Sequence, residues 1–519
     1  MVVATGTALS RLTGVARFFA LFVLASDLRD AYVLANNTPN IVYELILGGI
    51  LTATLVPLFT QQLVNDDRDG TDAVVSVTLV ALVGLTLVAV GVAPLLILLY
   101  GSNTPDGVDS DAFRSVGIGL SLLFAPQVFF YGVMAVGSAL LNARRRFFAA
   151  AWAPVLNNLI VITALLSVRA ITSGPPSVGQ AARDGQLRLL IGLGTTAGIV
   201  AMAVSLGPAL WRAGVRLRFR PRLRHPGVRA AARLSGWTLG YVVANQVAAQ
   251  TINYLNDPGS GDVASYQVAF MFFQLPHGLL AVSLMTTFQP DLARASVNGA
   301  WDDFHRRMLQ GLRLLVAVVV PASVGYLTLA MLVARIGPGA AVFDDGTAAE
   351  MLPVAGALAG FAPGLIGFSV YLFVLRGFYA AQDTRRPFWI NAAKNALNVA
   401  AGLALVVPFD LVGLSSAYSI AYIGGAVLAV AALLRRLPSG FDLRGFVTTL
   451  ARCLAAAAAM AAAVAATVLA LTAGDDDRIL LGVALAVPVG AVTYLAAAAA
   501  LGLGRDTGLA DRLPARLRR

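Results

Sequence analysis

Apolar segments of about 20 residues recur along the whole chain, and short polar stretches separate them. A helix of about 20 apolar residues is long enough to cross the hydrocarbon core of a bilayer. About fourteen such segments are predicted, and they begin near Val3, Ile41, Val74, Phe113, Phe148, Leu187, Val228, Val263, Leu312, Leu352, Phe388, Leu411, Val447 and Ile479. The pattern therefore predicts an all-α polytopic membrane protein.

The composition agrees with this class and excludes several others. Of 519 residues, 58% are hydrophobic and 13% are charged, whereas soluble domains carry about 25% charged residues. The single cysteine, Cys453, excludes an internal disulfide and a cysteine-based metal site. Because the chain has no phosphate-binding glycine-rich loop, no histidine cluster and no soluble catalytic domain, we predict a transporter rather than an enzyme. Neither a cofactor nor a bound metal is expected.

Charge alternates between successive loops. Basic loops contain Arg144–Arg146, residues 212–233, Arg306–Arg307, Arg385–Arg386, Arg435–Arg436 and Arg512–Arg519, and acidic loops contain Asp27 and Asp30, Asp106–Asp111, Asp257 and Asp262, Asp344–Asp345 and Asp475–Asp477. Arginine-rich loops stay on the cytoplasmic side of a membrane, so both termini are predicted to be cytoplasmic. The net charge of +11 then reflects membrane topology, and no nucleic-acid partner is expected.

The chain also contains an internal repeat. Leu141–Phe148 has a counterpart at Ala381–Phe388, and Glu44–Pro57 has one at His277–Pro290. Such a repeat predicts two pseudo-symmetric six-helix lobes with a central cavity between them. The predicted parts are an N-terminal lobe (1–215), a basic cytoplasmic inter-lobe linker (216–227), a C-terminal lobe (228–440), accessory helices 13 and 14 (441–505) and a basic cytoplasmic tail (506–519).

Two arginines lie within the first apolar segment, Arg11 and Arg17. An arginine inside a membrane costs about 2.5–3.5 kcal/mol on insertion scales, so it normally faces a polar cavity or an anionic partner. Ser10, Gly14 and Arg17 share one face of a helix, and Gly14 is predicted to be a helix break or hinge. The arrangement predicts a site for an anionic ligand. The alternative is that the arginines form structural ion pairs.

The second helix carries the acidic and amide groups of the candidate site. Pro39 lacks a backbone donor and is expected to bend or break the helix, which would free polar backbone near Asn40. Glu44 lies about one turn beyond Asn40, so both can face one cavity. Asp30 is predicted to pair with Arg11 or Arg17, or to orient one of them, and structural ion pairing of Asp30 and Glu44 remains the alternative.

The second lobe has one cationic candidate, Lys394, which is the only lysine of the chain. It shares a helix face with Asn391, Asn395 and Asn398, so it either lines a hydrated interior or extends its ammonium group to the membrane surface. In the eighth segment, Gln274 and Pro276 mirror the proline-containing half of the second helix, and a helix break is predicted at Pro276. The neighbouring His277 is interpreted as structural.

These motifs resemble those of the MurJ (MviN) family, which comprises bacterial lipid II flippases of the multidrug/oligosaccharidyl-lipid/polysaccharide exporter superfamily. The resemblance rests on Ser10–Arg17, Asp30–Tyr32, Pro39–Asn40, Gly49, Val56–Pro57, Phe273–Val282 and Gln382–Pro387. It implies a multi-pass protein of the bacterial cytoplasmic membrane. Such a protein moves the undecaprenyl-diphosphate-linked peptidoglycan precursor from the inner to the outer leaflet by alternating access, for cell-wall synthesis.

The resemblance also implies roles for individual residues. The cavity arginines of the family, thought to contact the diphosphate, map onto Arg11 and Arg17, with Ser10 beside them, and Asp30 matches the aspartate of the family's second span. The implied partners are the lipid-linked precursor, the lipid bilayer, and proteins of cell division or cell-wall synthesis.

The chain departs from the family pattern at four places. Phe18 stands where an aspartate is common, Tyr43-Glu44 where many members carry an arginine, and Met271 and Gln274 where an arginine and a glutamate are common. The cavity is thus less cationic than usual, and Lys394 is hypothesised to restore one charge. Three alternatives stay open: a flippase for another polyprenyl-diphosphate-linked saccharide, a cation-coupled multidrug exporter, and a non-transporting cell-wall scaffold.

Overall fold

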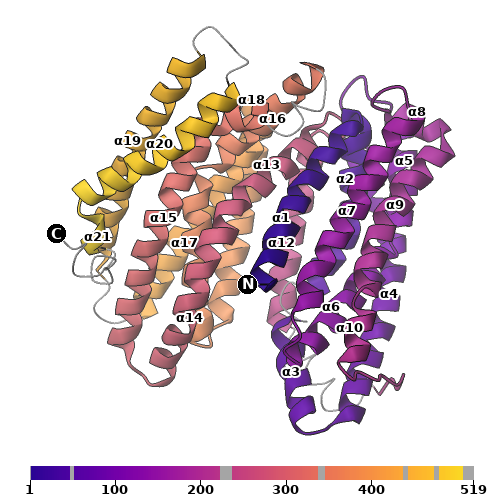
Figure 1. Cartoon of the computed structure of the whole chain (residues 1–519), viewed down its shortest axis with the longest axis horizontal. Coiled ribbons are helices and arrows are strands. Elements are labelled where there is room, and N and C mark those ends of the chain that lie inside the picture. Colours follow the sequence, from indigo (N-terminus) through magenta and orange to yellow (C-terminus); the bar gives the residue numbers. More distant parts are fainter. Residues whose placement is uncertain are drawn as a thin grey trace. The chain divides into compact units, whose positions relative to one another are not determined.

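Helices make up nearly all of the computed structural model, which describes residues 2–46, 52–222, 236–336, 345–436, 442–472 and 479–506. No strand occurs among these residues, so the predicted all-α class is confirmed. The chain divides into two compact units, residues 1–264 (indigo to magenta in Figure 1) and residues 265–519 (rose to yellow).

The first unit is built from long apolar helices joined by short helical turns. Its elements are α1 (Val2–Ala20), η1 (Leu21–Val23), α2 (Ser26–Ile46), α3 (Thr52–Val64), α4 (Arg68–Tyr100), α5 (Ser110–Phe124), α6 (Gln127–Ala143), α7 (Phe148–Ile171), α8 (Val178–Arg183), α9 (Gly185–Val204), α10 (Gly207–Arg212) and α12 (Gly236–Leu255). Loop aspartates begin several of these helices by accepting hydrogen bonds from free backbone amides. Asp67 caps α4, Asp109 caps α5 and Asp184 caps α9.

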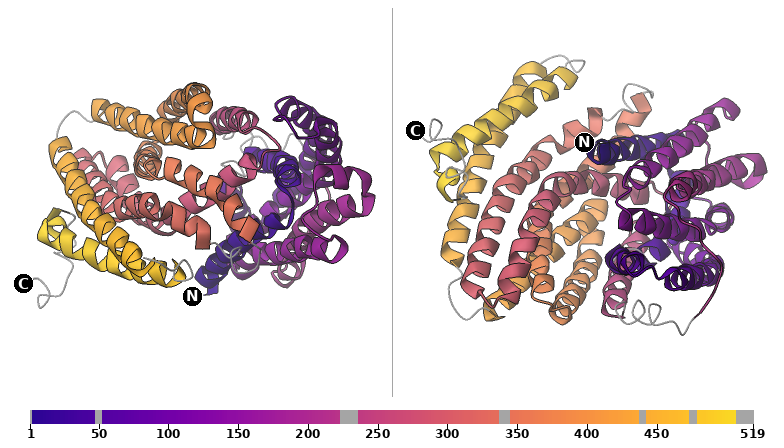
Figure 2. Two further views of the ribbon diagram at one scale, coloured as in Figure 1. Left: turned by 90° about the horizontal axis from the view of Figure 1, so that it is seen from above. Right: turned by 60° about the horizontal axis from the view of Figure 1, so that its bottom comes forward.

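The second unit continues the helical pattern. Its elements are α13 (Asp262–Pro276), which begins at the unit boundary, η3 (His277–Ala281), α14 (Val282–Val297), α15 (Trp301–Ile336), α16 (Asp345–Phe361), α17 (Gly364–Ala380), α18 (Arg385–Arg436), α19 (Leu443–Thr472), α20 (Ile479–Ala500) and α21 (Leu503–Asp506). Element α18 contains two helices that meet at a kink, where Asp410 has φ 43° and ψ −129°. The kink lies one residue before the apolar segment predicted to begin near Leu411. Figure 2 shows α19 and α20 packed side by side, and their accessory role stays a prediction.

Eight helices or helix runs in the described ranges are long and apolar enough to cross a membrane. A ninth candidate is the bent pair Leu352–Phe361 and Gly364–Ala380, with an angle of 48° between its helices. The polytopic membrane class is therefore confirmed. The exact count of fourteen stays a prediction.

The predicted start of the second helix, near Ile41, is wrong. Helix α1 ends at Ala20, η1 follows, and α2 begins at Ser26. Asp27 and Asp30 therefore lie inside α2 instead of in a loop. The helix accommodates these charges because they find backbone donors: Asp27 Oδ2, for example, accepts from the Val178 amide at 3.1 Å.

The first part of the predicted linker, residues 216–222, has no regular secondary structure and is bound to α4. The Arg218 amide donates to Asp72 Oδ1 at 3.0 Å, and the Arg220 amide donates to Ser76 Oγ at 2.7 Å. The Arg220 guanidinium also pairs with Asp69 at 2.8 Å. Residues 223–227 of the linker lie outside the described residues. Helix α12, which the sequence places in the second lobe, belongs to the first unit.

Candidate functional site

The position of α1 is fixed by close packing on α7. Gly6 leaves no space for a side chain, because a Cβ there would lie 2.8 Å from the Trp152 ring. One turn further, Asn158 Nδ2 donates to the Ser10 carbonyl at 3.1 Å and to Thr13 Oγ1 at 3.0 Å. Gly14 also faces Asn158, because a Cβ added at Gly14 would lie 3.7 Å from Asn158 Nδ2. The Ser10–Gly14 face of α1 thus packs against α7, and α1 is continuous through Gly14.

The two arginines of α1 carry charges that the described protein does not neutralise. Arg11 is exposed and Arg17 is partly exposed. Neither takes part in any ion pair within the part of the chain that the structure describes. The Arg17 guanidinium lies 5.9 Å from the centre of the Phe18 ring. An uncompensated guanidinium in an apolar helix remains available to an anionic group.

Asp30 does not act as predicted, because its carboxylate is engaged elsewhere. The side chain is fully buried. Oδ2 accepts from the amides of Gly259 at 3.0 Å and Gly261 at 2.8 Å, and Oδ1 accepts from the Ala264 amide at 2.9 Å. The carboxylate therefore holds the turn between α12 and α13 onto α2, and it forms no ion pair with Arg11 or Arg17. Both glycines have positive φ, 104° and 102°, and the glycine-rich turn was the sequence signal for such an amide cluster.

The rest of the predicted α2 site is only partly described. The helix continues through Pro39 to Ile46, so the predicted break there is not observed. Proline removes a single amide donor, and the bonds on either side of it keep the helix intact. Asn40 is partly exposed. The side chain of Glu44 lies outside the described residues.

A polar network inside the first unit was not anticipated from the sequence. Asn36 Nδ2 donates to Gln127 Oε1 at 3.4 Å, and Gln127 Nε2 donates to Thr196 Oγ1 at 2.9 Å. The neighbouring Tyr32 hydroxyl lies 3.0 Å from Thr195 Oγ1. These contacts join α2, α6 and α9. The sequence signal was a set of amide and hydroxyl side chains isolated within apolar helices, which tend to bind helices together.

In the second unit, the regular helix is interrupted next to Pro276. Helix α13 ends at this proline, and the next turn, His277–Ala281, is π-helical. His277 is buried, with Nδ1 3.0 Å from Ser369 Oγ and its ring edge-on to Phe368. These contacts support the structural interpretation of His277. Gln274 is exposed.

Lys394 is enclosed within the second unit. Only 3% of the residue is exposed. Nζ donates to the Tyr422 hydroxyl at 3.1 Å and lies 4.2 Å from the centre of the Tyr422 ring and 5.9 Å from that of Tyr371. No carboxylate of the described residues pairs with it. The ammonium group therefore neither reaches the membrane surface nor is accessible to a ligand in this structure, and the asparagines at 391, 395 and 398 are buried as well.

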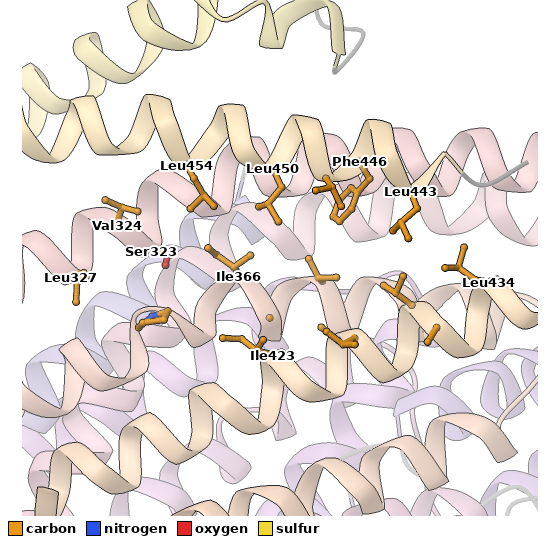
Figure 3. A pocket seen from close by; sticks show the side chains of 18 residues that line it. Ser323, Val324, Leu327, Ile366, Ile423, Leu434, Leu443, Phe446, Leu450 and Leu454 are labelled. Atoms are coloured by element: carbon orange, nitrogen blue, oxygen red, sulfur yellow. The ribbon is translucent and has the colours of Figure 1, made fainter. Parts of the chain in front are cut away.

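An apolar groove of about 640 Å³ lies between α15, α17, α18 and α19. Figure 3 shows Leu443, Phe446, Leu450 and Leu454 on one wall, and Ile366, Ile423 and Leu434 across from them. The Ser323 hydroxyl in the lining is already bound to the Ala362 carbonyl at 2.7 Å. The groove thus offers hydrocarbon contacts and can hold an aliphatic chain.

The described residues contain no group of three or more histidine, cysteine, aspartate or glutamate side chains that could hold a metal ion.

Comparison with known proteins identifies relatives along most of the chain. A family model described as "Lipid II flippase MurJ" matches residues 19–478. The "Probable lipid II flippase MurJ" of Haemophilus influenzae is 28% identical over 436 residues, which cover 79% of this chain and 81% of that protein. The "Lipid II flippase MurJ" of Burkholderia cenocepacia is 28% identical over 391 residues, which cover 73% of this chain and 72% of that protein. Arg11 and Arg17 precede the matched region, so the family model does not cover them. Their assignment to the candidate site depends on their positions within the apolar helix α1.

Solved structures agree at the level of the fold. A structure titled "Lipid II flippase MurJ, inward closed conformation" has a TM-score of 0.75 at 19% identity and covers 97% of this chain and 99% of its own. An inward-facing multidrug resistance transporter of the MATE family and MOP superfamily has a TM-score of 0.66 at 13% identity. The match covers 82% of this chain and 94% of that transporter.

Proposed function

The chain belongs to the lipid II flippase MurJ family, and from this premise we propose that it moves lipid II from the inner to the outer leaflet of the bacterial cytoplasmic membrane. The protein then acts as a transporter and not as an enzyme. The observation that carries the proposal at the level of the site is the pair of arginines on α1, Arg11 and Arg17, which lack ion-pair partners among the described residues.

The arginines are proposed to bind the diphosphate of the cargo. A guanidinium presents a planar array of N–H donors that matches two phosphate oxygens at once, and such charge-assisted bonds are about twice as strong as neutral ones. Arg11 is exposed, so it can bind a head group without first breaking a contact. Ser10, Asn40, Glu44 and Gln274 are retained as proposed contributors to the polar surroundings of the cargo.

Transport is proposed to follow alternating access between two lobes, with the boundaries predicted from the repeat and with both termini in the cytoplasm. The head group crosses in a polar cavity while the lipid tail stays in the bilayer, and rocking of the lobes exposes the cavity to one side at a time. Asp30 is proposed to support this process as a positioning residue, because its carboxylate binds backbone amides of the α12–α13 turn.

Complementation tests the proposal. A bacterium depleted of its own lipid II flippase receives the wild-type gene, Arg11→Ala, Arg17→Ala, or the control Arg146→Gln, which changes an exposed loop arginine, and membrane levels of each protein are measured. We expect wild type and the control to restore growth, and both α1 variants to fail at normal expression. No rescue by well-expressed wild type would point to another polyprenyl-linked cargo or to a scaffold. Rescue by every variant would refute the arginine site.

A further inference from the structure

A second cavity of the second unit lies where the two ends of α18 meet. Its volume is about 710 Å³. The lining consists of Asp383, Arg385, Arg386, Trp389, Ile390, Ala432 and Arg435. Residues from the beginning and the end of α18 thus form one pocket, at the end of the unit that carries the arginine-rich loops.

The pocket has a surplus of positive charge. Arg386 pairs with Asp383, with 3.4 Å between Nη1 and Oδ2. Arg385 and Arg435 form no ion pair with any residue that the structure describes. Three arginines against one aspartate leave two positive charges without compensation. Such a pocket favours an anion with several oxygen acceptors, such as phosphate, because a guanidinium can donate two parallel hydrogen bonds to two of its oxygens.

Trp389 places this pocket at the depth of the lipid head groups. The residue is 59% exposed, although its ring packs edge-on against Phe388 at 5.2 Å. It lies in the first turns of an apolar helix, directly after a charged loop. Exposed tryptophan at such positions is enriched at the interface between membrane and water, because the indole has an apolar body and one polar N–H group.

The apolar groove in Figure 3 reaches the same turn of α18. Ala431 and Leu434 line the groove, while the next residues in sequence, Ala432 and Arg435, line the basic pocket. Between Ile423 and Leu434 the groove follows α18 for about 16 Å, at 1.5 Å per residue. This length is about half of a hydrocarbon core of roughly 30 Å. The groove is therefore about one leaflet deep and ends next to a pocket suited to phosphate.

We propose that the basic pocket and the groove together bind one anionic glycerophospholipid, with its phosphate at Arg385 and Arg435 and an acyl chain along α18. A free phosphate would not use the groove, and a polyprenyl tail is longer than one leaflet is deep. The site goes beyond the flippase function. It requires only that this end of α18 lie at a membrane surface. The test of this site therefore does not depend on whether the protein transports lipid II.

Quenching of Trp389 fluorescence tests the site. The full-length protein is reconstituted in phosphatidylcholine vesicles with increasing fractions of phosphatidylglycerol that carries bromine in its acyl chains. The Trp389 signal is the difference between wild type and Trp389→Phe. We expect saturable quenching at a low fraction of phosphatidylglycerol, and weak quenching by brominated phosphatidylcholine at the same fraction. The double variant Arg385→Gln/Arg435→Gln should need roughly tenfold to thirtyfold more phosphatidylglycerol, from about 1 kcal/mol for each basic residue.

Two further variants separate the parts of the proposal. Arg146→Gln/Arg294→Gln also removes two exposed arginines, but outside the pocket, and should bind as wild type does. Val427→Phe fills the groove at an exposed residue without adding a tryptophan, and it should abolish saturable quenching although the arginines are intact. Equal responses of the two double variants, or normal binding by Val427→Phe, would overturn the composite site.

Competition identifies the ligand class. Excess inorganic phosphate should leave the quenching unchanged, and relief by phosphate would show a site for free anions instead. Unlabelled polyprenyl diphosphate should compete no better than unlabelled phosphatidylglycerol. Much stronger competition by polyprenyl diphosphate would show a cargo site and refute the phospholipid assignment.

Discussion

At the scale of single residues, Asp30 shows how a motif residue can act through the backbone. Its two carboxylate oxygens accept three amide hydrogen bonds from residues more than 200 positions away in sequence. A hydrogen bond to a charged group contributes about 1.5–3 kcal/mol, and a buried amide left without an acceptor is costly. Three backbone amides of the segment between α12 and α13 therefore depend on this one side chain for their acceptor.

Replacing Asp30 with asparagine keeps the size of the side chain but exchanges one acceptor oxygen for an NH₂ donor that faces other donors. We expect Asp30→Asn to lower the free energy of unfolding by about 2 kcal/mol or more, measured by denaturation in detergent. Asp66→Asn is the control, because Asp66 and its partner Arg68 are largely exposed and such pairs contribute little. Equal stability of both variants would show that the three amide bonds do not hold the turn.

Lys394 presents the opposite case, a buried charge with weak compensation. A cation–π contact contributes about 2 kcal/mol when it is desolvated, whereas burial of an ion costs several kcal/mol. The free-energy cost of burying the ammonium group therefore exceeds the stabilisation that the aromatic contacts provide. We therefore expect Lys394→Met, which keeps the length of the side chain, to leave the thermal unfolding midpoint unchanged or to raise it.

The hypothesis that Lys394 supplies a missing charge makes a separate prediction. Lys394→Gln should then fail to complement a flippase-depleted strain while folding normally. Growth equal to wild type would discard a functional role for the ammonium group, and a large fall in stability of Lys394→Met would show that the lysine is structural.

At the scale of elements, the contact between α1 and α7 depends on one small residue. A Cβ at Gly6 would meet the Trp152 ring at 2.8 Å and the Ala151 carbonyl at 3.2 Å. Overpacking of this kind costs about 1–3 kcal/mol, more than the roughly 1 kcal/mol that alanine gains over glycine inside a helix. We expect Gly6→Ala to lower the unfolding midpoint.

Gly84 provides the matched control, because it lies inside α4 with no atom within 4 Å of a Cβ position. Gly84→Ala should raise the midpoint through helix propensity alone. The double variant Gly6→Ala/Trp152→Ala tests the cause. If the ring is the obstacle, its removal should abolish the penalty of Gly6→Ala, and an unchanged penalty would contradict this account.

The elements also show where the sequence pattern was insufficient. The apolar pattern predicted a separate segment beginning near Leu411, next to the kink observed at Asp410. It did not predict the start of α2 at Ser26, because charges in the first turns of α2 resemble a loop. The pattern cannot show that Asp27 and Asp30 bind distant amides. Charged residues are tolerated in a buried helix where tertiary partners exist, and hydropathy contains no information about those partners.

At the scale of the whole molecule, the charge of the cargo couples transport to the membrane potential. Moving one elementary charge across 100 mV changes the free energy by about 2.3 kcal/mol. Since the proposed cargo is an anion, a potential that is negative inside should favour its export or the return of an empty cationic cavity. We expect faster outward flipping of lipid II in proteoliposomes with this potential than without it. Rates that do not respond to the potential would show that no net charge moves in the slow step.

The sequence by itself determined the class of this protein, the position of most helices, the two arginines of α1 and the family. These features depend on the length of apolar runs, the distribution of charge and short motifs, all of which are local in the chain. Only the tertiary structure decided that Asp30 binds the α12–α13 turn, that Lys394 is enclosed by tyrosines, and that a basic pocket adjoins an apolar groove at the end of α18. Each of these depends on contacts between residues far apart in sequence, and the partner of a buried polar group is set by packing, which no local pattern specifies.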